Sequence, residues 1–193
     1  FSMTDEERYE LYIASWLHDC GKVATPPHIV DKSTKLETIF DRIDLIKTRM
    51  ELLKKDAEIN FLKRKLKQVK DLSFDDKYKK EIEKIDSDME FLEKCNIGGE
   101  FMDPSSQSRV TSIGNKKVSI FGKKQNFLSK DEVQNLNITK GTLLPDEREI
   151  INDHIVITIE MLEQLPYPKH LKNVPEFAGG HHEKMDGTGY PKG

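Results

Sequence analysis

Apolar residues recur at a heptad spacing through residues 39–92, and this pattern constrains the fold more than any other feature of the chain. The pattern breaks over 71–76 and then resumes, which indicates two consecutive helices. We therefore expect an antiparallel, coiled-coil-like helical hairpin over residues 38–95. Its predicted seam consists of Ile39, Ile43, Ile46, Met50, Leu53, Ala57, Leu62, Leu66 and Val69 on the first arm, and Tyr78, Ile82, Ile85, Met89 and Leu92 on the second.

The charge of this segment is almost balanced, with fifteen Lys or Arg and fourteen Asp or Glu residues between positions 41 and 95. Such a mixed surface suits a solvated hairpin and disfavours a DNA-binding arm. The whole chain has a formal net charge of −3, which also gives no support for DNA as a partner. We interpret the hairpin as a structural insertion or as an arm through which the chain forms a homodimer.

The remaining segments predict an all-α fold. We expect one helix to begin at a capping box at Thr4 and to bury its second half, and another to run from Pro145 to Leu165 with His154 on its core side. Residues 96–139 are rich in Gly, Ser, Asn and Lys and predict a loop-rich insertion. Within it we expect a short hairpin near 118–121 and a short helix over 129–136.

Metal-ligand residue types gather at two places that lie about 160 residues apart, at His18-Asp19 and at His181-His182. Adjacent helical residues diverge by about 100°, so each doublet suggests two metals, or one metal with a bridging carboxylate. Together with His154 they offer four imidazoles and one carboxylate, a set that suits Fe, Mn, Zn or Ni. Paired metals suit phosphodiester hydrolysis, and Lys22 is placed to meet a phosphate oxygen.

The two clusters also resemble known motifs. His18-Asp19-Cys20-Gly21-Lys22 is similar to the HDxGK motif of the HD phosphohydrolase superfamily. The segment from His181 to Pro191 resembles the HHExxDGxGYP motif of the HD-GYP subfamily and carries each of its fixed letters. The resemblance covers residues 1–37 and 140–193, which we expect to form an HD-GYP catalytic domain built as an HD-domain helical bundle, with 38–139 inserted.

This resemblance implies a function and assigns roles to residues. It implies a phosphodiesterase that hydrolyses cyclic di-GMP to the linear dinucleotide or GMP in bacterial second-messenger signalling, using two or three transition-metal ions, most often iron or manganese. By position, Asp19 and Lys22 become catalytic residues, with Asp19 bridging the metals. The implied metal ligands are His18, Asp19, His154, His181 and His182, and the implied loop comprises Gly187, Gly189, Tyr190 and Pro191. The resemblance also implies contacts of this loop with GGDEF-type partner proteins.

Other readings of the same residues stay open. A catalytically inactive HD-GYP domain could bind a nucleotide or a partner, and a general HD phosphohydrolase could act on another nucleotide. The family takes further ligands from a helix before the first motif and from an aspartate after the loop. We therefore expect the chain to be part of a longer signalling protein, as a cytoplasmic domain that can belong to a membrane-anchored sensor. The two cysteines, Cys20 and Cys95, predict free thiols in a reducing compartment.

Overall fold

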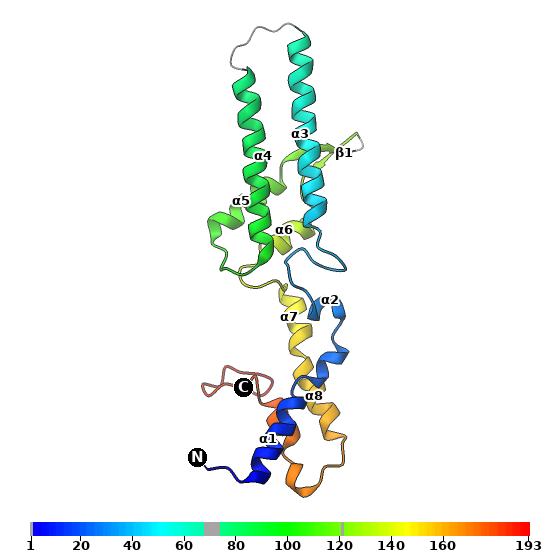
Figure 1. Ribbon diagram of the computed structural model, residues 1–193, viewed down its shortest axis with the longest axis vertical. Helices are drawn as coiled ribbons and strands as arrows, with labels where there is room; N and C mark the ends of the chain where they lie inside the picture. The colour runs from blue at the N-terminus through cyan, green and yellow to red at the C-terminus, as the bar shows by residue number, and fades with distance from the viewer. Residues whose placement is uncertain (1, 68–73, 121) are drawn as a thin grey trace. The chain divides into compact units, whose positions relative to one another are not determined.

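The computed structural model describes residues 2–67, 74–120 and 122–193. The chain divides into two compact units, one formed by Phe1–Asp31 with Pro145–Gly193 and the other by Lys32–Leu144. The sequence placed these divisions near 37 and 140 instead. The first division falls earlier because Lys35 and Leu36 are buried in the second unit. Figure 1 follows the elements of each unit along the chain.

The first unit is helical. Its elements are α1 (Asp5–Leu17), a short 3-10 helix (Cys20–Ala24), α2 (Pro27–Val30), α7 (Pro145–Asn152), α8 (His154–Glu163), a second 3-10 turn (Lys169–Leu171) and α9 (Val174–Gly179). Thr4 and Glu7 cap α1 reciprocally, as its sequence predicts. The core of this unit lies between α1, the end of α8 and α9, around Ala14, Leu162, Val174 and Ala178.

Two expectations for these helices are corrected. The second half of α1 is only partly buried, because Tyr12 and Trp16 are 55% and 72% exposed. Ala14 is the buried residue of this half, and Ile13 and Leu17 pack against the core while remaining partly exposed. The helix expected from Pro145 to Leu165 is divided at Asp153, although the backbone there remains right-handed helical (φ −62°, ψ −16°). The division makes His154 the first residue of α8.

The second unit is built on the predicted helical hairpin. Figure 1 shows α3 (Ile43–Leu66) and α4 (Phe74–Ile97) side by side and antiparallel. Ion pairs follow this register from one end to the other: Lys47 with Glu93 (2.6 Å), then Lys54 with Asp86 (2.5 Å), then Lys65 with Asp75 (3.2 Å). Near the far end, the rings of Phe61 and Tyr78 stack at 4.5 Å.

The predicted seam holds for only part of its length. Its buried members are Ile43, Ile46, Met50, Ala57, Ile85 and Leu92. In contrast, Ile39 is 94% exposed and precedes α3, and Leu66 is 82% exposed at its end. The predicted seam residue Val69 lies outside the described residues. The apolar contact between the arms is therefore concentrated where the rest of the unit packs against them.

The segment 96–139 contains more structure than its loop-like composition suggests. It forms α5 (Pro104–Gly114), the antiparallel strands β1 (Lys117–Ile120) and β2 (Lys123–Asn126), and α6 (Lys130–Leu136). The hairpin and the short helix were expected, whereas α5 was missed, although Asp103 caps it and Pro104 begins it. Apolar residues of this segment complete the core of the α3–α4 hairpin: Met102, Val110, Ile113, Val118, Phe127, Leu128 and Leu136.

The described part of the chain is therefore mostly helical, with a single two-stranded sheet. This agrees with the predicted all-α class. Within the described ranges, no helix combines the length and the apolar character that crossing a bilayer requires.

Candidate metal centre

Three of the predicted histidine ligands are oriented by the same kind of contact. The Nδ1 atoms of His18 and His181 lie 2.6 Å from the carbonyl oxygens of Ser15 and Ala178, each three residues earlier in the chain. His154 makes the same contact with the carbonyl oxygen of Ile151. A carbonyl oxygen only accepts hydrogen bonds, so each Nδ1 carries a proton, and in the neutral ring each Nε2 keeps its lone pair. Such contacts prepare imidazoles to bind metal through Nε2.

Asp19 lies among these imidazoles. Its Oδ1 atom is 3.2 Å from Nε2 of His154 and 3.7 Å from Nε2 of His181. Its Oδ2 atom is 3.2 Å from Nε2 of His18 and 2.8 Å from Nζ of Lys22. The two predicted clusters, far apart in sequence, are thus brought together in the first unit. The carboxylate faces a different imidazole with each of its oxygens.

The arrangement fits metal ions. Oδ1 of Asp19 and Nε2 of His154 are both buried, and neither has a hydrogen-bond partner among the described residues. In the neutral ring with its proton on Nδ1, both atoms are acceptors, so their 3.2 Å approach requires a proton or a metal cation close to both. The ligand atoms form two groups, and within each group all atoms lie within 4.8 Å of one another. One group comprises His154, His181 and His182, and the other comprises His18, Asp19 and His181. Imidazole with carboxylate is a donor set for transition metals.

The electrostatics keep Asp19 ionised. Partial burial alone would raise the pKa of its carboxyl group. The hydrogen bond and positive charge of Lys22 oppose this effect, and the imidazoles of His18 and His154 add to the opposition. The net result is a pKa below the usual value, so Asp19 is a carboxylate at neutral pH and can serve as an anionic ligand.

His182 is held differently from the other three histidines. Its ring stacks on the ring of Tyr190, with centroids 4.7 Å apart and planes 14° apart. Burial lowers the pKa of His182, the nearby His181 and His154 lower it further, and Asp19 only partly offsets these effects. His182 is therefore neutral at pH 7, which is the form that binds metal.

The predicted loop folds back onto the histidine doublet. The amide of Tyr190 donates to the carbonyl oxygen of His182 at 3.3 Å. A Cβ atom on Gly189 would lie 2.4 Å from the backbone nitrogen of Lys184 and 2.5 Å from Cα of Glu183, so only glycine fits. Gly187 takes a positive φ of 72°, which glycine adopts without strain. These contacts place Tyr190 against His182, with Pro191 directly after it.

The two acidic residues beside this loop stabilise its backbone. Glu183 accepts hydrogen bonds from the amides of Lys192 (2.7 Å) and Gly193 (3.2 Å). Asp186 accepts from both the amide and the hydroxyl of Thr188. Both carboxylates are thus occupied by loop contacts and lie outside the two ligand groups described above.

Two residues that position the site were missed by sequence reasoning. Thr158, fully buried on α8, accepts a hydrogen bond from the amide of Gly21 (2.9 Å) and donates to the carbonyl oxygen of His18 (3.3 Å). Glu10 on α1 accepts from the amide and the side chain of Asn173, just before α9. Nothing in the local sequence predicts that Glu10 is buried, because its partner Asn173 lies far away in the sequence.

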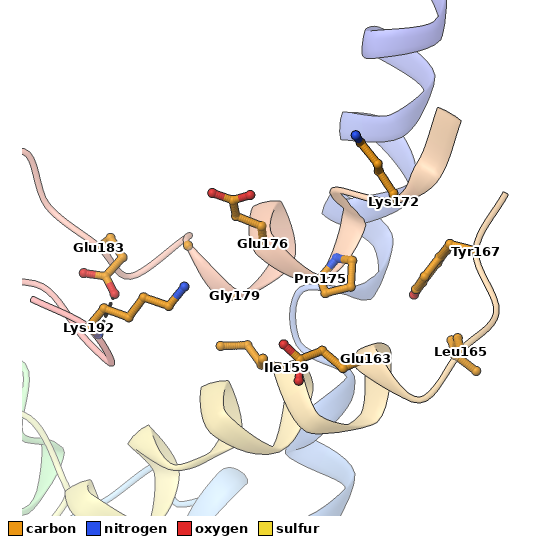
Figure 2. Close-up of a pocket in the computed structure, with 11 residues that line it drawn as sticks. Ile159, Glu163, Leu165, Tyr167, Lys172, Pro175, Glu176, Gly179, Glu183 and Lys192 are labelled. Atoms are coloured by element: carbon orange, nitrogen blue, oxygen red, sulfur yellow. Dashed lines mark hydrogen bonds between the residues drawn. The ribbon is translucent and has the colours of Figure 1, made fainter. Parts of the chain in front are cut away.

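A separate pocket of about 740 Å³ lies beside the end of α9, and Figure 2 shows its lining. The lining residues include three carboxylates and two ammonium groups: Glu163, Glu176, Glu183, Lys172 and Lys192. None of the five predicted ligands lines this pocket. Its excess of carboxylates would repel a phosphodiester, so the cluster around Asp19 remains the candidate site.

The comparison with known families agrees with this geometry. Residues 131–193 match the HD domain family. The match includes His154, His181 and His182, whereas the His18–Lys22 segment lies before it. HD domains are generally metal-dependent phosphohydrolases, and residues 131–193 are similar to them. No curated protein and no solved structure matches the chain.

Proposed function

We propose that this chain is an HD-GYP-type phosphodiesterase that hydrolyses cyclic di-GMP in bacterial second-messenger signalling. The observation that carries the proposal is the unpaired, buried Oδ1 of Asp19, which faces Nε2 atoms of His154 and His181. The loop from Gly187 to Pro191, packed against His182, supports the HD-GYP assignment through its resemblance to that subfamily. Phosphodiester hydrolysis is the reaction that a cluster of this kind suits best.

The five ligands His18, Asp19, His154, His181 and His182 would hold two or three transition-metal ions, iron or manganese, with zinc or nickel as alternatives. When bound, these ions supply positive charge that polarises a phosphoryl group and activates water. The chain itself holds the imidazoles in their metal-binding tautomer through backbone carbonyl oxygens. It also keeps Asp19 ionised through the adjacent charge of Lys22.

Lys22 is the residue suited to meet the substrate phosphate. Its ammonium lies 2.8 Å from Oδ2 of Asp19, and its side chain is 38% exposed. It is therefore anchored beside the cluster and still accessible to a ligand from solvent. A phosphate oxygen there would gain a charge-assisted hydrogen bond from Nζ. Tyr190 stands at the rim, and because burial raises the pKa of its hydroxyl, it stays neutral and can donate a hydrogen bond.

The proposal is tested with the full-length protein purified anaerobically. Bound metal is quantified by elemental analysis, and turnover of cyclic di-GMP is compared with that of other cyclic dinucleotides. We expect two or more transition-metal ions per chain and no turnover by Asp19→Ala. The matched control is Asp146→Ala, which removes an exposed carboxylate from the first turn of α7.

The outcomes separate the alternatives. Absence of bound metal, or turnover that persists in Asp19→Ala, would contradict the assigned centre. Metal binding and nucleotide binding without turnover would identify an inactive binding module. Turnover of a different nucleotide with none of cyclic di-GMP would retain the phosphohydrolase and reject the substrate.

A further inference from the structure

Helix α3 carries two apolar stripes, and only one of them is covered within the described residues. The first is the buried seam toward α4 and the rest of the second unit. The second lies on another face of the helix, where four large apolar side chains are between 46% and 82% exposed. This exposed stripe consists of Leu45, Leu52, Ile59 and Leu66.

The spacing of the exposed stripe is what requires an explanation. Single exposed apolar side chains are normal on protein surfaces. Here, however, each stripe residue follows the previous one by seven positions, through the whole of a helix about 36 Å long. A seven-residue repeat keeps its members on one line only if the helix supercoils slightly around another helix. The stripe is therefore shaped for a helical partner.

The surface beside the stripe also has room for a partner's side chain. A groove of about 270 Å³ lies next to Leu52, between α3 and the β1–β2 hairpin. Leu53, Val118 and Phe127 supply its apolar lining. A side chain from a helix laid along the stripe can occupy this groove, as a knob enters a hole in coiled-coil packing.

The neighbouring positions favour a parallel copy of α3 itself. If the stripe residues are heptad position a, position d holds Thr48, Lys55 and Leu62. Parallel, in-register pairing packs each a residue against its own copy, so the apolar side chains meet. Antiparallel pairing would instead set each a residue against a d residue. Leu52 would then lie against Lys55, and Ile59 against Thr48.

Charges on the flanks of the stripe agree with this orientation. In a parallel pair, position g of one helix approaches position e of the next heptad on the other. Glu58 then faces Lys63 of the second copy, and Asp44 faces Arg49, which already pairs with Glu132 in its own chain. Glu51 facing Asp56 is the unfavourable pair on the flanks, and Lys55 at position d faces its own copy, with a side chain long enough to turn its ammonium toward water. The antiparallel register that sets Leu52 against Lys55 would bring Glu51 toward Glu58, but it would also bring Asp56 toward Arg49 and Asp44 toward Lys65. The flanking charges therefore permit a second copy of α3 as the partner, and the apolar a positions favour the parallel orientation.

From these relations we propose that α3 is a homodimerisation helix, which pairs in parallel with α3 of a second copy through Leu45, Leu52, Ile59 and Leu66. A two-fold axis along the helix pair makes the interface self-complementary. This proposal stands independently of the metal centre and of the proposed enzymatic activity, since α3 belongs to the other unit.

Sedimentation velocity over a micromolar concentration series tests the association. The double variant Leu52→Glu/Ile59→Glu is compared with Ile39→Glu/Phe101→Glu, which changes two exposed apolar residues of the same unit outside the stripe. We expect the wild type and this control to dimerise and the stripe variant to stay monomeric, with unchanged helicity by circular dichroism. A monomeric wild type, or a dimer that survives in the stripe variant, would overturn the proposal.

Cysteine cross-linking tests the orientation and does not depend on how the charged variant folds. Ile59→Cys should form a disulfide-linked dimer under mild oxidation, while Ile39→Cys and the parent chain, with its native Cys20 and Cys95, serve as blanks. In a mixture of Leu45→Cys and Leu66→Cys chains, each should couple with its own kind. Coupling between the two kinds would overturn the parallel register.

Discussion

The amide of Gly21 donates a 2.9 Å hydrogen bond to the hydroxyl of Thr158, across 137 positions of sequence. A Cβ atom on Gly21 would lie 2.1 Å from the carbonyl oxygen of His154, so the turn after Asp19 is pressed directly against α8. The same hydroxyl donates to the carbonyl oxygen of His18. The buried side chain of Thr158 therefore holds the turn that carries His18 and Asp19 against α8, next to His154.

We expect Thr158→Val to weaken metal binding by about 10–100-fold, the usual range for residues that orient ligands. The valine fills the same space but leaves the Gly21 amide and the His18 carbonyl without their partner. Thr158→Ser keeps the hydroxyl and should bind metal nearly as tightly as the wild type. Competitive metal titration checks both variants, and equal affinities for Val and Thr would contradict the positioning role.

Gly189→Ala should disrupt the loop and leave the metal content of the protein unchanged. The added methyl group would meet backbone atoms of Glu183 and Lys184, which cannot move aside as a flexible side chain could. Tyr190 then leaves its stack on His182, and we expect turnover to fall by about 100-fold, as for a displacement of about 1 Å at an active site. Metal content, measured in parallel, should stay unchanged.

Gly99→Ala is the matched control for this variant, because a Cβ atom at Gly99 would have no neighbour within 4 Å. Its turnover should equal that of the wild type. Equal turnover in Gly189→Ala would show that the loop does not shape the reaction, even if the metal centre is correctly assigned.

Lys35→Met should destabilise the second unit. Lys35 is 2% exposed, and its ammonium donates to the carbonyl oxygens of Leu136 (3.1 Å) and Ile138 (2.7 Å) at the end of α6. Methionine matches the length of the side chain but leaves these buried acceptors unpaired. We expect a loss of about 1–3 kcal/mol in the free energy of unfolding. Chemical denaturation measures it, and the exposed Lys130→Met is the control.

The cap of α5 predicts a pH dependence of stability. Hydrogen bonds from the hydroxyls of Ser105 and Ser106 and from their amides hold the pKa of Asp103 far below its ordinary value of 3.8. The unfolded chain therefore takes up a proton at Asp103 before the folded chain does. The stabilisation is fully present above the unfolded pKa and is lost as the pH falls toward the native pKa.

Comparison of the wild type with Asp103→Asn by urea denaturation from neutral pH down to pH 2 checks this sign. The advantage of the wild type in the free energy of unfolding should be constant near neutral pH and should shrink below about pH 4. An advantage that grows on acidification would contradict the assigned cap.

Local patterns in the sequence were sufficient wherever the deciding contacts lie within a few residues. The capping box at Thr4, the hairpin arms and the short helix after Ser129 depend on such contacts, and the structure contains all of them. The two histidine clusters could also be predicted to meet, because metal chemistry requires several ligands at one point. The HD domain match over 131–193 contains the second of these clusters.

Long-range packing decided what the sequence could not. The residue type and sequence pattern predict Trp16 in the core, but it is exposed. The residue type predicts Lys35 at the surface, but it is buried. Thr158 carries no motif, yet it joins the two halves of the candidate site. The burial and hydrogen bonding of Lys35 and Thr158 depend on residues more than 100 positions away, and no local periodicity records such partners. The sequence thus determined which side chains could bind metal, and the tertiary structure decided which groups orient them.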